Sequence, residues 1–143
     1  MPEGRKPTAV EGHHEGVPPG AYVTSGVFRG YDTGRHHFVE RLRMARGLLA
    51  RALDACPPGP VVVYDICSSD GRVVLPVLAG HPRRDETRAF LFELDPDGVR
   101  AARASAAQAR LDQVVVVEGD AGTPAPYRGR PRADVVVVSG VFV

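Results

Sequence analysis

Four short apolar runs from residue 61 onward constrain the fold of the chain more than any other feature. They are Val61–Ile66, Ala89–Leu94, Val114–Val117 and Val135–Val138. Polar residues do not alternate with the apolar ones, which is typical of parallel strands that are covered on both faces. We therefore expect four strands, each buried on both faces.

Helical patterns precede and separate these runs. Apolar residues recur on one face from Phe38 to Leu53, and Gly71–Ala79 is a shorter helical piece that contains Pro76. The Ala-rich segment Pro96–Arg110 begins with a proline that suits a first helical turn, and Asp95 or Asp97 is able to cap it. The alternation predicts an α/β fold, a Rossmann-like, doubly wound and mostly parallel sheet.

Length and composition exclude several classes. The chain has 143 residues, enough for one ordinary domain, and 18 basic against 17 acidic residues give a net charge of +1. This balance provides no clear nucleic-acid or anionic membrane footprint. No run reaches the roughly 18 apolar residues of a membrane span, and the start lacks a secretory signal, so we expect a cytoplasmic protein.

The chain divides into three parts on this interpretation. Residues 1–20 are predicted to be a disordered arm, 21–60 an N-terminal segment with its helix, and 61–143 a partial ligand-binding domain. Arg83 and Arg84 are expected in a solvated loop. Cys67 is expected to be a small buried thiol rather than a nucleophile, and no spacing of His or Cys predicts a metal site.

Acidic residues follow the predicted strands at the edge where such sheets bind ligands. Glu93 lies 22 residues beyond Gly71 (93 − 71), near the position of the ribose-binding acid of a dinucleotide fold. Its carboxylate could accept both ribose hydroxyls, and Asp120 could accept an adenine amino group. The simpler alternative is that these are ordinary acids at strand ends, which cap the next helix.

The loop after the first strand favours one adenosine ligand over another. A pyrophosphate needs glycines for close approach, whereas no G-x-G-x-x-G run is present and Asp65 and Asp70 would repel it. Acidic residues suit a ligand with an ammonium and a sulfonium group. The loop therefore favours S-adenosylmethionine over NAD as the cofactor.

Four motifs carry a resemblance to a known family. They read VYDICSSDGR (63–72), FELDPDGV (92–99), EGDA (118–121) and ADVVVVSGVF (133–142). In this order and spacing, the segment from about Tyr31 to Phe142 resembles the N-terminal half of a class I S-adenosylmethionine-dependent methyltransferase. The resemblance implies a sheet with about four of the usual seven strands. It also implies methyl transfer to an acceptor that is a small molecule or otherwise unidentified.

The resemblance also implies roles for individual residues. Asp65, Cys67, Ser69 and Gly71 would shape the loop around the methionine moiety, Glu93 would hold the ribose and Asp120 the adenine edge. Asp134 and the turn from Ser139 to Phe142 would border the methyl group and the acceptor.

Two departures from the family pattern modify the expectation. Cys67 and Ser69 occupy positions that are usually glycine, where a Cβ atom restricts φ and crowds a cofactor. The sequence also ends after the fourth run, which predicts a truncated form and self-association through an exposed edge of Val135–Val138. The alternatives are a catalytically inert, adenosine-ligand-binding fragment or pseudoenzyme and, less favoured, an NAD(P)-binding protein.

Overall fold

The four predicted strands form one parallel sheet. The computed structural model describes residues 36–139, with side chains from Val39 onward, so the arm predicted for residues 1–20 lies outside the described residues. The strands β1 (Val61–Ile66), β2 (Thr87–Glu93), β3 (Val114–Glu118) and β4 (Val135–Val138) lie in the order β3-β2-β1-β4. In the centre, Val63 of β1 is paired with Ala89 of β2 and with Val135 of β4.

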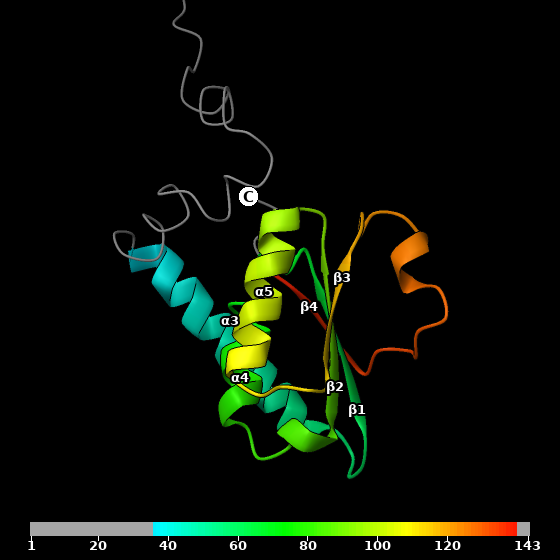
Figure 1. Cartoon of the computed structure of the whole chain (residues 1–143). Coiled ribbons are helices and arrows are strands. Elements are labelled where there is room, and N and C mark those ends of the chain that lie inside the picture. The colour runs from blue at the N-terminus through cyan, green and yellow to red at the C-terminus, as the bar shows by residue number, and fades with distance from the viewer. Residues whose placement is uncertain (1–35, 140–143) are drawn as a thin grey trace, which may run out of the picture.

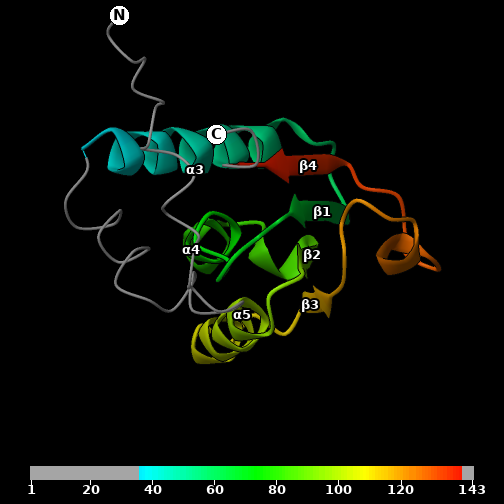
Figure 2. The ribbon, with the colours of Figure 1, turned by 90° about the horizontal axis from the view of Figure 1, so that it is seen from above.

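Helices cover one face of this sheet. The helices α3 (His36–Ala55), α4 (Val74–Gly80) and α5 (Pro96–Gln108) lie together on one side, and the short 3₁₀ helix η2 (Arg84–Glu86) precedes β2 (Figure 1). The connection from β3 to β4 crosses the opposite face and contains the 3₁₀ helix η3 (Ala125–Tyr127) (Figure 2). The predicted Rossmann-like α/β architecture is confirmed, and the strand order reverses between β1 and β4.

Local sequence signals account for the start of α5 and for the proline of α4. Asp95 is the N-cap of α5, because its side chain accepts a hydrogen bond of 2.9 Å from the backbone N–H of Asp97. Pro96 follows as the first helical residue. Pro76 is the third residue of α4, in the first turn, where a missing N–H interrupts no helical hydrogen bond.

The main core lies between the helices and the sheet. Leu53 of α3 and Leu78 of α4 are at most 1% exposed, and they belong to one apolar cluster with Val63 and Leu91. Burial of a side chain of this size contributes about 1.5–3 kcal/mol. The cluster therefore joins α3, α4, β1 and β2 into one folded unit.

The second face of the sheet is covered only in part. The ring of Tyr127, from η3, lies 4.7 Å from that of Phe92 and 6.0 Å from that of Tyr64, between ring centroids. Over β4, however, Val136 is 56% and Val138 48% exposed. The prediction that every strand is buried on both faces is wrong for β4, because the connection from β3 to β4 packs on β1 and β2.

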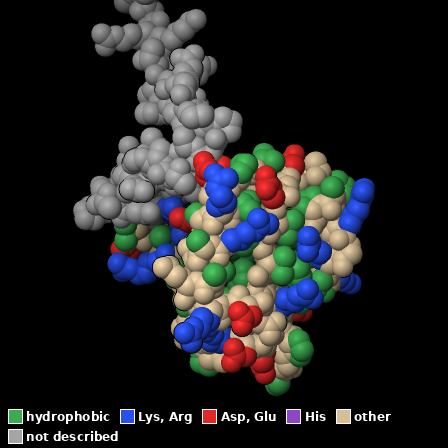
Figure 3. Space-filling model, viewed as in Figure 1, with side chains coloured by type: hydrophobic (Ala, Val, Ile, Leu, Met, Phe, Trp, Pro, Cys, Tyr) green, Lys and Arg blue, Asp and Glu red, His purple; other side chains and the backbone are tan. Residues whose placement is uncertain are grey.

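Charged side chains of both signs occur on the described surface (Figure 3). Figure 3 shows basic and acidic groups mixed on the face that it presents. None of the described helices combines the length and the apolar character that crossing a membrane requires.

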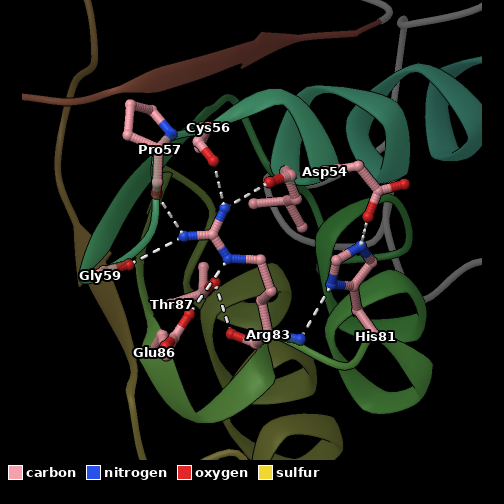
Figure 4. A network of polar contacts seen from close by, with 9 residues as sticks. Asp54, Cys56, Pro57, Gly59, His81, Arg83, Glu86 and Thr87 are labelled. Atoms are coloured by element: carbon pink, nitrogen blue, oxygen red, sulfur yellow. Dashed lines mark hydrogen bonds and ion pairs between the residues drawn. The ribbon is translucent and has the colours of Figure 1, made fainter.

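Arg83 fixes the end of α3 to the rest of the fold. Its guanidinium donates hydrogen bonds of 2.7–2.9 Å to four carbonyl oxygens at or just after that helix end, those of Leu53, Cys56, Pro57 and Gly59 (Figure 4). A cation at a helix C-terminus satisfies carbonyls that have no partner within the helix. The prediction that Arg83 lies in a solvated loop is therefore wrong.

Candidate functional site

Parallel pairing brings the predicted site residues to one end of the sheet. Glu93 and Glu118 are paired neighbours at the ends of β2 and β3. Cys67 directly follows β1, and Ser139 follows Val138, which is paired with Ile66. Asp120 comes two residues after β3. These carboxyl ends lie toward the top of Figure 1, and β1 and β4 flank the reversal of strand order, where open α/β sheets bind ligands.

Asp134 is not part of this end of the sheet. It precedes β4 and lies beside the start of β1, where its carboxylate accepts a hydrogen bond of 2.8 Å from the backbone N–H of Val62. The backbone N–H of Asp134 in turn donates to the carbonyl of Val62 at 2.8 Å. The role beside the methyl group and the acceptor that the resemblance implied for Asp134 is therefore wrong, because the length of β4 separates it from the site.

The loop between β1 and α4 turns sharply through alternate residues with positive φ. The φ angles are 55° at Cys67, 56° at Ser69 and 79° at Gly71. This left-handed region costs a residue with a Cβ atom roughly 1–2 kcal/mol, and glycine adopts it freely. The backbone thus keeps the conformation of a glycine-rich loop at two positions where this chain has side chains.

The carboxylate of Glu93 holds this loop against the start of α5. One oxygen accepts the backbone N–H of Ser69 at 2.6 Å, and the other accepts that of Asp95 at 3.0 Å. A Cβ atom on Gly98 would lie 3.0 Å from Cγ of Glu93, so the packing needs a small residue there. Glu93 therefore has a structural role, but the cap of α5 is Asp95 and not, as the simpler interpretation of the sequence expected, Glu93. The predicted contact of Glu93 with ribose remains a prediction.

Asp65 is a buried carboxyl group beneath the loop. Its side chain is 3% exposed, and burial, together with the nearby charge of Glu93, raises its pKa to about 7. Its Oδ2 atom and the hydroxyls of Ser68 and Ser69 are buried without a hydrogen-bond partner among the described residues. Buried polar groups are normally paired, so these three atoms mark a place suited to a polar ligand.

Cys67 lies among three carboxyl groups. Its thiol is exposed, which corrects the prediction of a buried cysteine. Partial burial, then the charges of Glu93, Asp65 and Asp120, raise the pKa of the thiol. A raised pKa disfavours the thiolate, so Cys67 is unsuited to be a nucleophile. The carboxylates of Glu93 and Asp120 would favour a cationic ligand here.

Asp120 and Tyr127 complete the rim on the side of β3. One carboxylate oxygen of Asp120 accepts the backbone N–H of Gly122 at 2.8 Å. The hydroxyl of Tyr127 donates to the carbonyl of Ala121 at 2.7 Å. Burial, and then the ionisable groups of Cys67, Asp120 and Tyr64, raise the pKa of the Tyr127 hydroxyl. Sequence reasoning missed Tyr127, because a single aromatic residue in a Pro- and Arg-rich loop was the only signal.

Asp70 does not act as a free negative charge. Arg72 donates to both of its carboxylate oxygens, at 2.8 and 2.7 Å, and the carbonyl of Arg72 accepts two hydrogen bonds from Arg46 of α3. Since Asp65 is also partly protonated near neutral pH, the two acids that were expected to repel a pyrophosphate do so only weakly. The preference for a cation now depends chiefly on Glu93 and Asp120.

Solved structures with the same fold include three methyltransferases. An S-adenosylmethionine-dependent methyltransferase from Thiobacillus denitrificans, crystallised with S-adenosyl-L-homocysteine, has 18% identity and a TM-score of 0.54, over 84% of this chain and 42% of that one. The C-terminal domain of precorrin-6Y C5,15-methyltransferase from Rhodobacter capsulatus has 22% identity and a TM-score of 0.52, over 66% and 47%. The precorrin-6Y C5,15-methyltransferase from Geobacter metallireducens has 21% and 0.51, over 68% and 49%.

These likenesses establish a fold. The described sheet has the architecture of class I S-adenosylmethionine-dependent methyltransferases, as its motifs predicted. The chain spans less than half the length of each of these three proteins. No protein-family model matches the sequence, and no curated protein matches it significantly.

Proposed function

We propose that the carboxyl end of the sheet binds S-adenosylmethionine and that the reaction served is methyl transfer to an unidentified acceptor. The observation that carries this proposal is the convergence of Asp65, Glu93 and Asp120 around Cys67 at the point where the strand order reverses. Carboxyl groups stabilise a ligand with ammonium and sulfonium charges and disfavour a pyrophosphate.

The residues present fit this cofactor in their chemistry. Glu93 and Asp120 supply hydrogen-bond acceptors for a ribose diol and an adenine amino group. The unpaired oxygen of Asp65 and the hydroxyls of Ser68 and Ser69 are acceptors for an ammonium group. Tyr127 adds an aromatic face, which attracts a cation. Gly71 and Ser139 border the same end of the sheet.

The bound cofactor would supply a methyl group activated by its positive sulfur. The residues of the chain would hold and orient this cofactor. Positioning accounts for much of the rate enhancement in such a displacement. Glu93 fixes the loop that contains Ser69, while the pair of Asp70 and Arg72, anchored to Arg46, fixes the loop where it enters α4.

An inert binding protein is the second candidate. The side chains of Cys67 and Ser69 project from left-handed backbone that is usually glycine in this family, and this favours weak binding without turnover. Transfer of a radiolabelled methyl group to a pool of small-molecule, protein and RNA acceptors separates the two candidates. Label recovered in an acceptor supports the enzyme, whereas binding without label supports the inert protein.

Calorimetric titration tests the binding itself. S-adenosylmethionine, S-adenosylhomocysteine and NAD⁺ are each titrated into the 143-residue chain. We expect saturable heats from the first two and none from NAD⁺. Glu93→Ala should weaken binding by about 1–3 kcal/mol, since it removes charge-assisted hydrogen bonds.

Glu118→Ala is the matched control. Glu118 is also a glutamate, it is exposed, and it lies beside Glu93 at the carboxyl end of the neighbouring strand β3. It should bind like the unaltered chain, with both variants checked by thermal melting. A saturable NAD⁺ signal without any from the methionine derivatives would overturn the proposal.

A further inference from the structure

The carboxyl group of Asp65 is buried among apolar neighbours. Because side chains alternate along a strand, it lies on the same face of β1 as Val63, which belongs to the core beneath the helices. Its partners on the two adjacent strands, Leu91 of β2 and Val137 of β4, are apolar. A carboxyl group in such surroundings is costly to ionise without a counter-charge.

No cation supplies that counter-charge among the described residues. None of their ion pairs includes Asp65. On the helix side, Arg46 of α3 donates to the carbonyl of Arg72, and the guanidinium of Arg72 donates to both carboxylate oxygens of Asp70. From the end of β2, Glu93 adds a further negative charge. The charges that face Asp65 therefore disfavour its ionised form.

The loop that follows β1 is held without the help of Asp65. The backbone N–H of Ser68 donates to the carbonyl of Phe92 at 3.0 Å, and that of Ser69 donates to Glu93 at 2.6 Å. The Oδ2 atom of Asp65 is buried and has no hydrogen-bond partner within the described part of the chain. A role in holding the loop therefore does not explain why an acid is buried at this position.

We propose that the site exchanges a proton for its ligand: Asp65 is a neutral carboxylic acid in the ligand-free protein and releases its proton when an ammonium group binds beside Cys67. The inference rests on the proposed function, because it takes the ammonium of the methionine moiety as the cation. On binding, the O–H bond of Asp65 breaks, the proton passes to the solvent, and the carboxylate charge that remains offsets the ammonium.

Cys67 marks the place from which a bound charge acts on Asp65. Its thiol is exposed, so a ligand can approach it. The charge of Asp65 is one of those that raise the pKa of the thiol, so the two positions are electrostatically coupled. A positive charge at the same place would stabilise the Asp65 carboxylate across a medium of low dielectric constant, even without direct contact.

Binding should therefore tighten as the pH rises. Burial, and then the charge of Glu93, raise the pKa of Asp65 to about 7, so below neutrality the ligand must displace a proton that is already bound. For an acid of this pKa that ionises on binding, linkage predicts a dissociation constant about tenfold lower at pH 8 than at pH 6. The pH would then regulate how much of the protein holds its ligand.

Two variants test the coupling in the absence of any ligand. Cys67→Lys places an ammonium group at this position, and Cys67→Gln places a long neutral side chain on the same backbone. NMR titration of the side-chain carboxyl carbon follows the ionisation of Asp65. We expect a midpoint about one pH unit or more lower in Cys67→Lys than in Cys67→Gln. Circular dichroism verifies that both variants are folded, and equal midpoints would overturn the proposal.

Calorimetry measures the released proton on the full chain of 143 residues. S-adenosylhomocysteine is titrated at pH 6.5 in two buffers with different heats of ionisation, and the difference in binding heat gives the number of protons released. We expect more than about half a proton per bound ligand. 5′-Methylthioadenosine has the same nucleoside without the ammonium group and should release none. Asp65→Asn should release none with either ligand, and Asp112→Asn should behave like the unaltered chain.

Failure of this proposal differs from failure of the proposed function. Saturable binding of S-adenosylhomocysteine without proton release, or equal release in Asp65→Asn, would overturn the exchange and leave the proposed function intact. The absence of any saturable heat would overturn the proposed function, and the two Cys67 variants would still decide whether a cation at this position ionises Asp65.

Discussion

The backbone N–H of Ser69 lies 2.6 Å from a carboxylate oxygen of Glu93, so the end of β2 holds the loop that follows β1. The other oxygen of the same carboxylate holds the N–H of Asp95 at the start of α5. The acid that is proposed to bind ribose is therefore also the residue that shapes the loop beside it. A change at Glu93 should alter the loop even when no ligand is present.

Amide hydrogen exchange measures this coupling. In Glu93→Ala, the amides of Ser69 and Asp95 lose their acceptor, so their exchange should accelerate by at least about tenfold, the equivalent of one hydrogen bond of 1.4 kcal/mol. Glu118→Ala should leave both amides unchanged. Equal protection of Ser69 in both variants would show that Glu93 does not hold the loop.

Asp65 should make the protein less stable as the pH rises. Its folded-state pKa of about 7 exceeds the ordinary aspartate pKa of 3.8, so the folded state retains a proton that the unfolded chain loses. The free energy of unfolding should fall between about pH 4 and pH 7 and remain low above that. Asn at this position carries no proton that titrates in this range. The free energy of unfolding of Asp65→Asn, measured in urea relative to that of the unaltered chain, should therefore be roughly 2–4 kcal/mol higher at pH 8 than at pH 4.

Asp112→Asn is the control for this measurement, because Asp112 is exposed and precedes β3 at the opposite end of the sheet. Its stability should follow that of the unaltered chain at each pH. A difference between Asp65→Asn and the unaltered chain that does not vary with pH would refute the role given to Asp65.

Glycine at the two left-handed positions should stabilise the fold. Cys67→Gly and Ser69→Gly relieve φ angles of 55° and 56°, and each should raise the free energy of unfolding by about 0.5–1 kcal/mol after the entropy of glycine is subtracted. Arg110→Gly is a control with a φ of 52° beyond the end of α5. It should gain similar stability in urea unfolding.

Ligand affinity distinguishes these variants. Cys67→Gly should bind S-adenosylhomocysteine more tightly, since it removes a side chain from the proposed site, while Arg110→Gly should bind like the unaltered chain. If Cys67→Gly stabilises the fold without any change in affinity, the Cys67 side chain does not border the ligand.

Arg83 should contribute more to stability than any solvated arginine. Arg83→Ala leaves four carbonyls near the end of α3 without their donor and should lower the free energy of unfolding by about 2–4 kcal/mol. Arg51→Ala removes an exposed arginine of α3 and should change the free energy of unfolding by less than about 0.5 kcal/mol. Thermal and urea unfolding of the two variants, side by side, give the comparison.

The strands were predictable because burial selects apolar residues directly. Val61–Ile66 and Val135–Val138 have the predicted bounds, and β2 begins at Thr87 rather than Ala89 because Thr87 is buried despite its hydroxyl, which donates to the carbonyl of Arg83. The exposure of β4 was not predictable, because it depends on where the connection from β3 to β4 packs.

The site was predictable only as a set of residues at one end of the sheet. Parallel pairing brings Cys67, Glu93, Asp120 and Ser139 to that end, whatever their side chains contact. The contacts themselves depend on tertiary geometry. Nothing in the sequence indicated that Glu93 would accept two backbone N–H groups. By contrast, the position of Asp134 directly before the predicted strand Val135–Val138 already indicated that it lies at the far end of β4.

An NMR titration with S-adenosylhomocysteine tests the central claim most directly, because backbone amide shifts locate a ligand without any assay of turnover. We predict saturable shifts concentrated in residues 65–71, 93–95 and 119–122, with the amides around Asp112 and Asp134 unmoved. The absence of saturable shifts at millimolar ligand, or shifts centred on the opposite end of the sheet, would contradict the assignment of this site.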